Sequence, residues 1–198
     1  MQAHMVNGKA SYYYADFIIY AILLLALAAF TPRGSRWDQL TWLGAAIAGA
    51  ASWTLVEYTL HRFVFHRMPF IADLHDAHHA SPRAYANTPT WLTLLILGGL
   101  FFLPIWCLFT LNIAFGAISG LIAGWLWYGL VHHVIHHRRP RRLAVALKAA
   151  SHRHLSHHAV EGGNFGVTTP VWDYVFGTNI SSRTRVKYIG PGNMRLPD

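Results

Sequence analysis

The chain has 198 residues, of which 54% are hydrophobic and 12% are charged. This charged share is about half of the usual value, which excludes a disordered, collagen-like or coiled-coil protein. The net charge is +8, from 16 Lys and Arg against 8 Asp and Glu. Because the apolar residues form blocks long enough to cross a bilayer, the positive charge indicates the cytoplasmic side of an integral membrane protein, and we expect no nucleic-acid partner.

Apolar segments in chain order predict about four transmembrane helices, and therefore an all-α integral membrane protein. The segments comprise residues 14–30, 39–60, 90–115 and 115–131. The second is rich in Gly and Ala, which allow close helix packing in lipid. We expect a tight reversal at Asn112 and Gly116, between the last two segments, and short helices around 143–158. Residues 1–198 are expected to form a single membrane-embedded domain.

The distribution of Lys and Arg predicts the orientation of the chain. Residues 61–89 hold three of the 16 basic residues and residues 132–198 hold ten, whereas the reversal between the last two segments holds none. Four spans would place 61–89 and 132–198 on the same membrane face. We therefore expect these two regions to form a helical cap in the cytoplasm.

Histidine is the most unusual component, with 14 residues where average usage gives about four or five. Thirteen fall into four clusters, each at or just beyond the expected cytoplasmic end of a span. The clusters are His61 and His66; His75, His78 and His79; His132, His133, His136 and His137; and His152, His154, His157 and His158. Clusters on one membrane face predict a metal site and disfavour a chance basic patch or a haem held within the bilayer.

The spacing within the clusters predicts which imidazoles converge. Residues at i, i+3 and i+4 share one face of a helix, so each His-x-x-His-His triplet should aim three imidazoles at one place. His132 and His136 should also converge, although His133 and His137 have the same spacing. The two histidines of the first cluster are about 140° out of phase on an ideal helix. They either flank a helix end or serve different metals.

The number of imidazoles indicates a dinuclear site. Imidazole suits iron, zinc, copper and nickel, and does not suit calcium or magnesium. One ion takes about four to six ligands, so ten converging imidazoles fit two ions better than one. The candidate ligands are His61, His66, His75, His78, His79, His132, His136, His154, His157 and His158.

The four ordered motifs resemble those of the fatty acid hydroxylase / sterol desaturase superfamily of membrane di-iron enzymes, and most closely its fatty acid 2-hydroxylases. The segment from Asn164 to Thr178 is similar to the family ending Phe-Gly-Val-Thr-x-Pro-x-Trp-Asp-x-x-Phe-Gly-Thr. The resemblance implies that the ten histidines bind two iron ions, for which zinc can substitute, and that O₂ is consumed. It also implies an external electron donor of cytochrome b5 or ferredoxin type, because we find no fused cytochrome b5 domain.

The function that this resemblance implies is O₂-dependent hydroxylation of a lipid drawn from the bilayer, with C2 of a fatty acyl chain as the expected position. A carotenoid ring or sterol hydroxylase or desaturase of the same superfamily is the alternative enzyme. A membrane metal-binding protein is the non-enzymatic alternative. Transporters place their ligands near the midplane along a path, whereas these clusters lie on one face.

Further residues are expected to support the ligands, because a ligating histidine normally donates its other N–H group to an acceptor. The candidates are Glu57, Asp76, His137 and Asp173. Glu57 lies one helical turn before His61, and a buried acid at a membrane end is functional by default. Several aromatic residues could line a lipid path, although interfacial anchoring or packing is their commoner role. They are Trp91, Phe101, Trp106, Trp125 and Trp127.

Overall fold

The computed structural model describes residues 10–29, 34–85, 88–138, 144–160 and 162–180. This part of the chain is helical and contains no strand, which confirms the all-α prediction. The elements are α1 (Ala10–Ala29), α2 (Arg36–Thr59), η2 (Leu60–Phe65), α3 (Ile71–Ala80), α4 (Thr90–Leu95), η3 (Ile96–Phe102), α5 (Leu103–Leu108), α6 (Leu111–His137), α7 (Val145–Ala159) and α8 (Val171–Val175). The segments η2 and η3 are π-helical.

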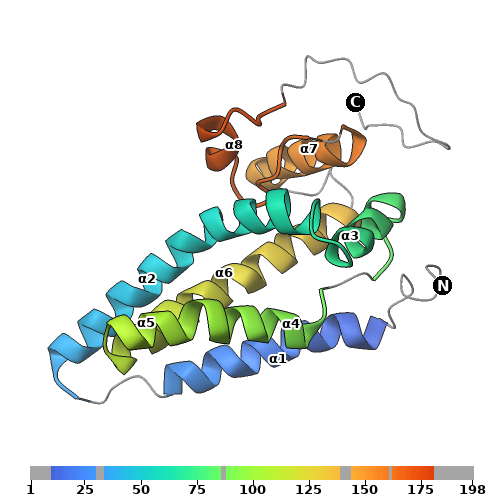
Figure 1. Cartoon of the computed structure of the whole chain (residues 1–198). Helices are drawn as coiled ribbons and strands as arrows, with labels where there is room; N and C mark the ends of the chain where they lie inside the picture. Colours follow the sequence, from blue (N-terminus) through green and yellow to red (C-terminus); the bar gives the residue numbers. More distant parts are fainter. Residues whose placement is uncertain (1–9, 30–33, 86–87, 139–143, 161, 181–198) are drawn as a thin grey trace.

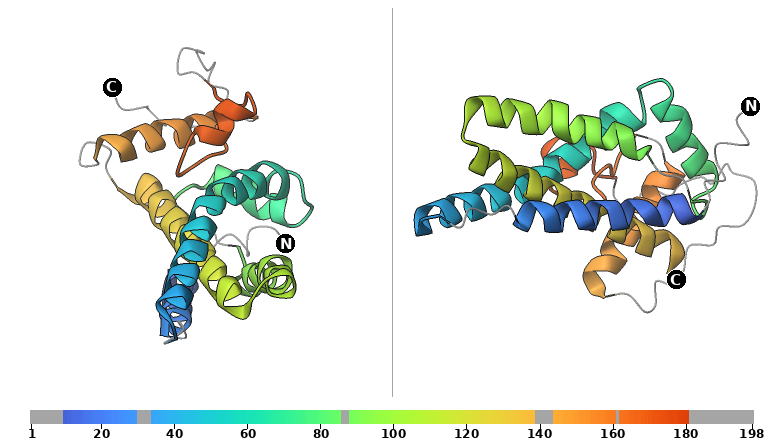
Figure 2. Two further views of the ribbon diagram at one scale, coloured as in Figure 1. Left: turned by 90° about the vertical axis from the view of Figure 1, so that its left-hand side faces the viewer. Right: turned by 90° about the horizontal axis from the view of Figure 1, so that it is seen from below.

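The long helices run between two ends of the molecule (Figure 1). At one end α1 finishes, α2 begins and α5 turns into α6. At the other end, called the cap end below, α2 and α6 finish beside α3 and α7. Helices α2 and α6 lie side by side, and α1 packs against α6 (Figure 2). All four histidine clusters are therefore carried by elements that meet at the cap end.

Small residues bring α2 and α6 into backbone contact. A Cβ atom on Gly49 would lie 2.1 Å from the carbonyl oxygen of Ala117, and one on Gly120 would lie 2.0 Å from that of Ala46. No real Cβ atom tolerates such distances, so glycine is required at both positions. The predicted role of the Gly-rich second segment in close packing is thus confirmed, and this packing sets where the two helix ends place their histidines.

The reversal before α6 comes earlier than predicted. Phe109 has an extended backbone, and Thr110 caps α6 by accepting a hydrogen bond from the backbone N–H of Ile113 at 3.3 Å. Threonine is a favoured N-cap residue, so the helix begins there and not at Asn112 or Gly116. The predicted boundary at residue 115 is therefore wrong, and α6 extends over 27 residues.

Within the described part of the chain, three helical stretches are long and apolar enough to cross a membrane: Ala10–Ala29, Thr90–Leu108 and Leu111–His137. Apolar side chains on them, such as Leu25 and Leu95, are exposed as lipid contact requires. The predicted span at 39–60 forms α2, which has 24 residues but is not among the stretches apolar enough to cross. Length and composition thus support three of the four predicted spans.

Candidate metal centre

Ten histidines form two groups at the cap end. The first histidine group contains His61, His66, His75, His79 and His157, and the second histidine group contains His78, His132, His136, His154 and His158. Within each group, one ring nitrogen from each residue lies within 4.8 Å of the others. These ten are the candidate ligands selected from the sequence, and their division into two fives matches the expectation of two ions.

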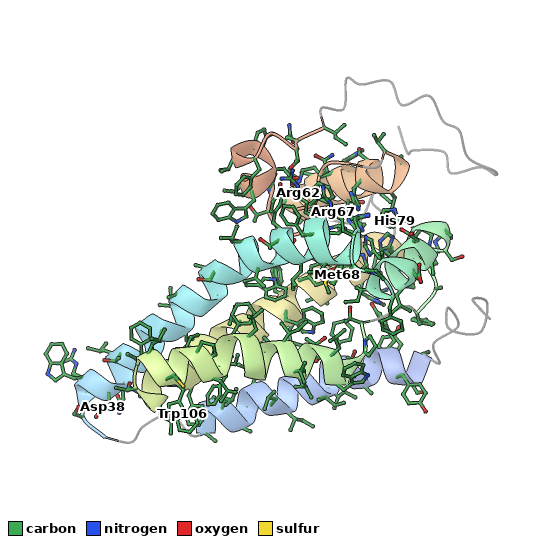
Figure 3. The ribbon with its side chains drawn as sticks, in the orientation of Figure 1. Asp38, Arg62, Arg67, Met68, His79 and Trp106 are labelled. Atoms are coloured by element: carbon green, nitrogen blue, oxygen red, sulfur yellow. The ribbon has the colours of Figure 1, made fainter. Side chains whose placement is uncertain are left out.

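Basic residues share the cap end with this centre. Figure 3 shows Arg62 and Arg67 near His79, whereas Asp38 and Trp106 lie at the opposite end. The side chain of Arg67 is exposed, and the nearest metal-candidate imidazoles are buried or half-buried behind it. The described residues therefore agree with the asymmetry of charge that the sequence predicted.

Each His-x-x-His-His triplet divides between the two groups, so the prediction that all three imidazoles aim at one place is wrong. On α3, His75 and His79 enter the first group while His78 enters the second. On α7, His154 and its i+4 partner enter the second group while His157 enters the first. Positions i+3 and i+4 lie about 100° apart around a helix. They can therefore face two neighbouring sites, and α3 and α7 each contribute to both.

His61 and His66 enter the same group although five residues separate them. His61 lies within η2, Leu60–Phe65, and His66 follows it directly; the π-helical backbone pairs residues five apart. The two rings stack with centroids 5.2 Å apart and planes inclined by 19°. The structure thus favours the alternative in which this pair lies at a helix end, because both imidazoles enter the same group.

The ambiguity between neighbouring histidines of α6 is resolved by their surroundings. His132 and His136 lie in the second group. The Nδ1 atom of His133 instead lies 3.1 Å from a tyrosine hydroxyl of α1. His137, expected to support the ligands, stacks on a tyrosine ring at a centroid distance of 5.5 Å and on His133 at 4.5 Å. It lies outside both groups.

The nitrogen atoms of the two histidine groups are suited to binding metal cations. The Nε2 atoms of His61 and His75 lie 3.1 Å apart, and those of His136 and His154 lie 2.9 Å apart. A neutral imidazole has a single N–H group, so five converging nitrogens cannot all satisfy one another, whereas a transition-metal ion accepts a lone pair from each. Among the described residues, the buried Nε2 of His78 has no hydrogen-bond partner, which is an atom that an ion would satisfy.

Two backbone carbonyls orient the first histidine group. The Nδ1 of His61 donates to the carbonyl oxygen of Phe165 at 2.6 Å, and the Nδ1 of His157 donates to that of Gly163 at 2.8 Å. Because a carbonyl can only accept, the proton is on Nδ1 and the Nε2 lone pair faces the centre. Side-chain acceptors were expected for these imidazoles; the acceptors are instead backbone carbonyls, which every residue carries and no sequence pattern marks.

Asp173 holds the loop that carries the Phe165 carbonyl. It is fully buried, and its two carboxylate oxygens accept hydrogen bonds from the backbone N–H groups of Phe165 and Gly166, each at 2.8 Å. The Thr178 hydroxyl donates to the same carboxylate at 2.8 Å. Asp173 was expected to contact a ligand directly; it instead positions a carbonyl that does.

Glu57 holds the next part of the same loop. Its carboxylate accepts hydrogen bonds from the backbone N–H groups of Val167 and Thr168, at 2.6 and 2.9 Å, and from the Thr168 hydroxyl at 2.5 Å. The acid is thus linked to the centre through the loop and not through an imidazole. Asp76, the remaining candidate, is exposed on α3.

Burial keeps these imidazoles neutral. Desolvation, followed by repulsion from neighbouring imidazoles, lowers the pKa of His78 to about 4 and that of His79 to about 3. The same causes lower the pKa of His157 to about 3 and hold that of His154 well below its usual value. A metal ligand must be deprotonated, so the set is ready to bind ions at neutral pH.

Comparison with known proteins identifies the family of this chain. Residues 46–178, more than half of the chain, match the model of the fatty acid hydroxylase family. The chain belongs to the fatty acid hydroxylase family. This confirms the resemblance inferred from the histidine motifs and the ending at 164–178.

Several relatives of the chain are named for an activity. A dihydroceramide fatty acyl 2-hydroxylase of Arabidopsis thaliana is 33% identical over 79% of this chain and 68% of the relative. A ceramide very long chain fatty acid hydroxylase of Schizosaccharomyces pombe is 34% identical over 67% of this chain and 41% of the relative. A fatty acid 2-hydroxylase of Homo sapiens is 27% identical over 73% of this chain and 41% of the relative. The matches thus span less than half of the latter two proteins.

The fold is also shared with a hydroxylase of known structure. The structure of full-length scs7p, in which only the hydroxylase domain is visible, matches with a TM-score of 0.72 and 26% identity. The match covers 85% of this chain and 67% of that chain. The family, the fold and the expectation of a hydroxylase enzyme therefore agree.

A cavity of about 90 Å³ reaches the candidate metal centre from between the apolar helices. Its wall includes His75 and His78 from α3 and His132 from α6. A second, apolar cavity of about 20 Å³ lies between α2, η3 and α6, and shares Phe65 and Trp125 with the first. A lipid chain in these cavities would therefore end against both histidine groups.

The aromatic residues singled out in the sequence divide between two roles. Trp125 lines both cavities and Phe101 lines the second. Trp91, Trp106 and Trp127 are exposed on the outer surface of the helices. The first two residues fit a lipid path, and the other three fit interfacial anchoring.

Proposed function

We propose that the chain hydroxylates C2 of a long fatty acyl chain, using O₂ and electrons from a separate protein. The observation that carries this proposal is the cavity whose wall contains histidines of both groups, because it gives a lipid from the bilayer access to the centre. The relatives that are 2-hydroxylases of fatty acids and ceramides support the substrate class and the position.

The location of the histidines supports reaction near the polar end of the lipid. Both groups are built where α2 and α6 finish, at the cap end of the bundle (Figure 1). A carbon that reaches them lies close to the head group, while the tail stays between apolar helices. Reaction in the middle of the chain would require ligands deep within the spans, and all ten lie at the cap end.

Two iron ions, one for each histidine group, are the proposed cofactors, and zinc can replace them because Zn²⁺ binds such ligands more tightly than Fe²⁺. When bound, the ions supply the activation of O₂ for cleavage of an unactivated C–H bond. The chain presents five imidazoles to each ion. It also fixes the tautomers of His61 and His157 through backbone carbonyls, and lines the approach with apolar side chains that exclude water.

The proposed orientation places the cap end in the cytoplasm, with four membrane passes that include α2. Support comes from the basic residues of this end, of which Arg67, Arg83, Arg138 and Lys148 are exposed. Such a surface attracts an acidic electron carrier, which fits a cytochrome b5- or ferredoxin-type donor.

Isotopically labelled O₂ tests the reaction. Membranes that contain the iron-loaded protein, a long-chain lipid and a reductant should place one labelled oxygen atom at C2 for each O₂ consumed. Label found only in water, with a new double bond in the lipid, would show a desaturase. Label on a carotenoid ring or sterol would establish the alternative hydroxylases. Bound metal without any oxidised lipid would establish the metal-binding alternative.

A matched pair of variants on α7 tests the centre. His158 belongs to the second histidine group, whereas His152 is exposed on the same helix. We expect His158→Ala to abolish turnover and to lower the metal content, and His152→Ala to keep turnover and two metals per chain. Elemental analysis of the folded wild-type protein that finds one metal or none would contradict the dinuclear proposal.

A further inference from the structure

A buried acid lies in the wall of the cavity that reaches the histidines. Asp16 is 6% exposed although it belongs to α1, one of the three stretches apolar enough to cross a membrane. It lines the same cavity as His75, His78 and His132. Ionisable groups at such positions are costly and are commonly functional. Asp16 also lies outside the part of the chain that matches the family model, residues 46–178.

The surrounding helices hold Asp16 at this place. The hydroxyl of Thr90, the first residue of α4, donates a hydrogen bond to its carboxylate. The hydroxyl of Tyr20, one turn further along α1, donates to the Thr90 carbonyl at 3.3 Å. On the other side, α6 approaches closely at Gly129, where a Cβ atom would lie 3.1 Å from the Phe17 ring. The acid is therefore fixed where α1, α4 and α6 meet.

We infer that Asp16 selects the head group of the lipid: it accepts a hydrogen bond from a neutral amide N–H or hydroxyl next to the reacting carbon, and it disfavours a free fatty acid. This inference rests on the proposed C2 hydroxylation. The relatives named as ceramide hydroxylases already suggest an N-acyl substrate, and the inference adds the residue that recognises its amide. The chemistry follows from the cavity, in which the head group, the acid and the histidines share one small volume.

Electrostatics gives this selection its direction. Two carboxyl groups in one poorly solvated cavity cannot both ionise easily, so a fatty acid beside Asp16 must give up its charge or bind weakly. An amide N–H can instead donate to the Asp16 carboxylate, and hydrogen bonds to charged groups are among the stronger ones. A site built to hydrogen-bond a substrate group also rejects analogues that lack the group.

The two cavities give the lipid a direction. The first has polar side chains, including Asp16 and Tyr13, beside the histidines, whereas the second is lined almost entirely by apolar ones such as Trp53 and Leu97. The head group therefore fits the first cavity and the tail fits the second. The histidines line the first cavity, so the carbon next to the head group lies beside them, which is the placement that reaction at C2 requires.

Equilibrium binding of radiolabelled lipids to the zinc-loaded protein tests the inference without turnover. Three lipids of equal chain length separate charge from donor capacity: an N-acyl amide, the free acid at about pH 9, where a carboxyl with a reference pKa of about 4 is ionised, and the methyl ester, which is neutral and has no donor. We expect the wild type to bind the amide about 10-fold more tightly than the ester, and the ester more tightly than the acid. Equal binding of amide and acid would overturn the inference.

Three variants, each checked for two bound zinc ions, complete the test. Asp16→Asn keeps the shape and removes the charge, so it should tighten binding of the free acid about 10-fold. Asp16→Leu should bind amide and ester equally. Tyr20→Phe removes a link between α1 and α4 but leaves the hydrogen bond from Thr90 to the Asp16 carboxylate, so it should retain the wild-type preference. If the Asp16 variants keep that preference, or Tyr20→Phe loses it, Asp16 only ties helices together and the inference is wrong.

The binding measurements test the inference about Asp16, and the turnover measurements test the proposed hydroxylation, so one claim can fail without the other. Loss of the binding preference in the Asp16 variants would establish the inference even for a protein that desaturates its lipid or leaves it unchanged. Conversely, labelled oxygen at C2 combined with wild-type preferences in both Asp16 variants would support the proposed function and overturn the inference.

Discussion

At the residue scale, the chemistry of the centre depends on which nitrogen of each imidazole carries the proton. His61 and His157 have their Nδ1 protons held by backbone carbonyls, so their Nε2 atoms face the other imidazoles of the first histidine group. Asp173 and Glu57 accept hydrogen bonds from backbone N–H groups of the loop that carries the Phe165 carbonyl. Buried carboxylates outside the two histidine groups thus position these imidazoles through the backbone.

The pairing on α6 leads to the first prediction. His136→Ala should lose the ion of the second histidine group, whereas His133→Ala should keep two metals per chain, because His133 contacts a tyrosine and lies outside both groups. Elemental analysis after purification in excess zinc measures the difference. The pairing would be refuted by the reverse pattern, with metal lost from the His133 variant alone.

Removal of Glu57 is predicted to destabilise the loop. Glu57→Ala leaves the buried N–H of Val167 and the N–H of Thr168 without their acceptor. Each such loss costs about 1–3 kcal/mol, so the midpoint of thermal unfolding should fall clearly. Asp76→Ala is the matched control, since Asp76 is exposed and its removal should leave the midpoint nearly unchanged. An unchanged midpoint for the Glu57 variant would show that the loop does not depend on this acid.

The metal-free protein should become less stable as the pH falls from about 6.5 to about 3. The pKa values of His79 and His157 are lowered to about 3 by burial, against about 6.5 in the unfolded chain. Within this window the unfolded state binds more protons, so stability falls with falling pH; above the window neither state is protonated at these sites. Unfolding midpoints after chelation, measured between about pH 7 and 4, should decrease steadily. A flat profile would contradict the burial of these rings.

At the scale of elements, the close approach of α2 and α6 positions the two helix ends that carry His61, His132 and His136. The contact depends on positions where no side chain fits, among them Gly49 and Gly120. The π-helical segment η2 then turns the end of α2 so that residues five apart share one face. Packing along the bundle and winding at its end together assemble the first histidine group.

A single methyl group at this contact is expected to disturb the bundle. In Gly120→Ala the new Cβ would lie 2.0 Å from the Ala46 carbonyl oxygen and 2.6 Å from the Ala50 nitrogen. Because backbone atoms cannot rotate away, overpacking should cost about 1–3 kcal/mol and lower the unfolding midpoint. Gly44→Ala is the control on α2, since a Cβ there meets nothing within 4 Å. Equal midpoints for the two variants would contradict the packing.

At the scale of the whole molecule, the cap end concentrates the histidines and exposed basic residues, while the opposite end holds the α5–α6 reversal (Figure 1). This arrangement meets two requirements of the proposed reaction. In the proposed function, the lipid reaches the centre from between the apolar helices, and a water-soluble electron donor reaches it from outside the bilayer. A centre at one end of a membrane bundle meets both, because it borders the lipid and the aqueous phase.

Thiol labelling tests the proposed orientation. In a Cys107→Ser background, which removes the single cysteine, Ser81→Cys reports the cap end and Arg36→Cys the opposite end; both positions are exposed. An impermeant reagent added to intact cells should label the Arg36 variant, and should label the Ser81 variant only after lysis. Labelling of the Ser81 variant from outside would place the cap end on the other side of the membrane.

The sequence by itself determined the helical class, three helices long and apolar enough to cross a membrane, the ten histidines that converge and the family. These features follow from local properties: apolar runs report lipid contact, and the count and spacing of imidazoles report affinity for metal. The sequence also predicted that Glu57 and Asp173 support the centre, since buried acids near a membrane end are rare. It did not predict that they act through hydrogen bonds to the backbone.

Only the tertiary structure decided how the ligands are shared. Helical periodicity shows that His75, His78 and His79 point in neighbouring directions, but the site that each one enters depends on where α6 and α7 lie. The pairing of His61 with His66 required a π-helical winding, and the acceptors of the imidazoles are carbonyls, which every residue has and no sequence pattern marks. These features depend on contacts between segments distant in the chain, so the packing of the helices determines them.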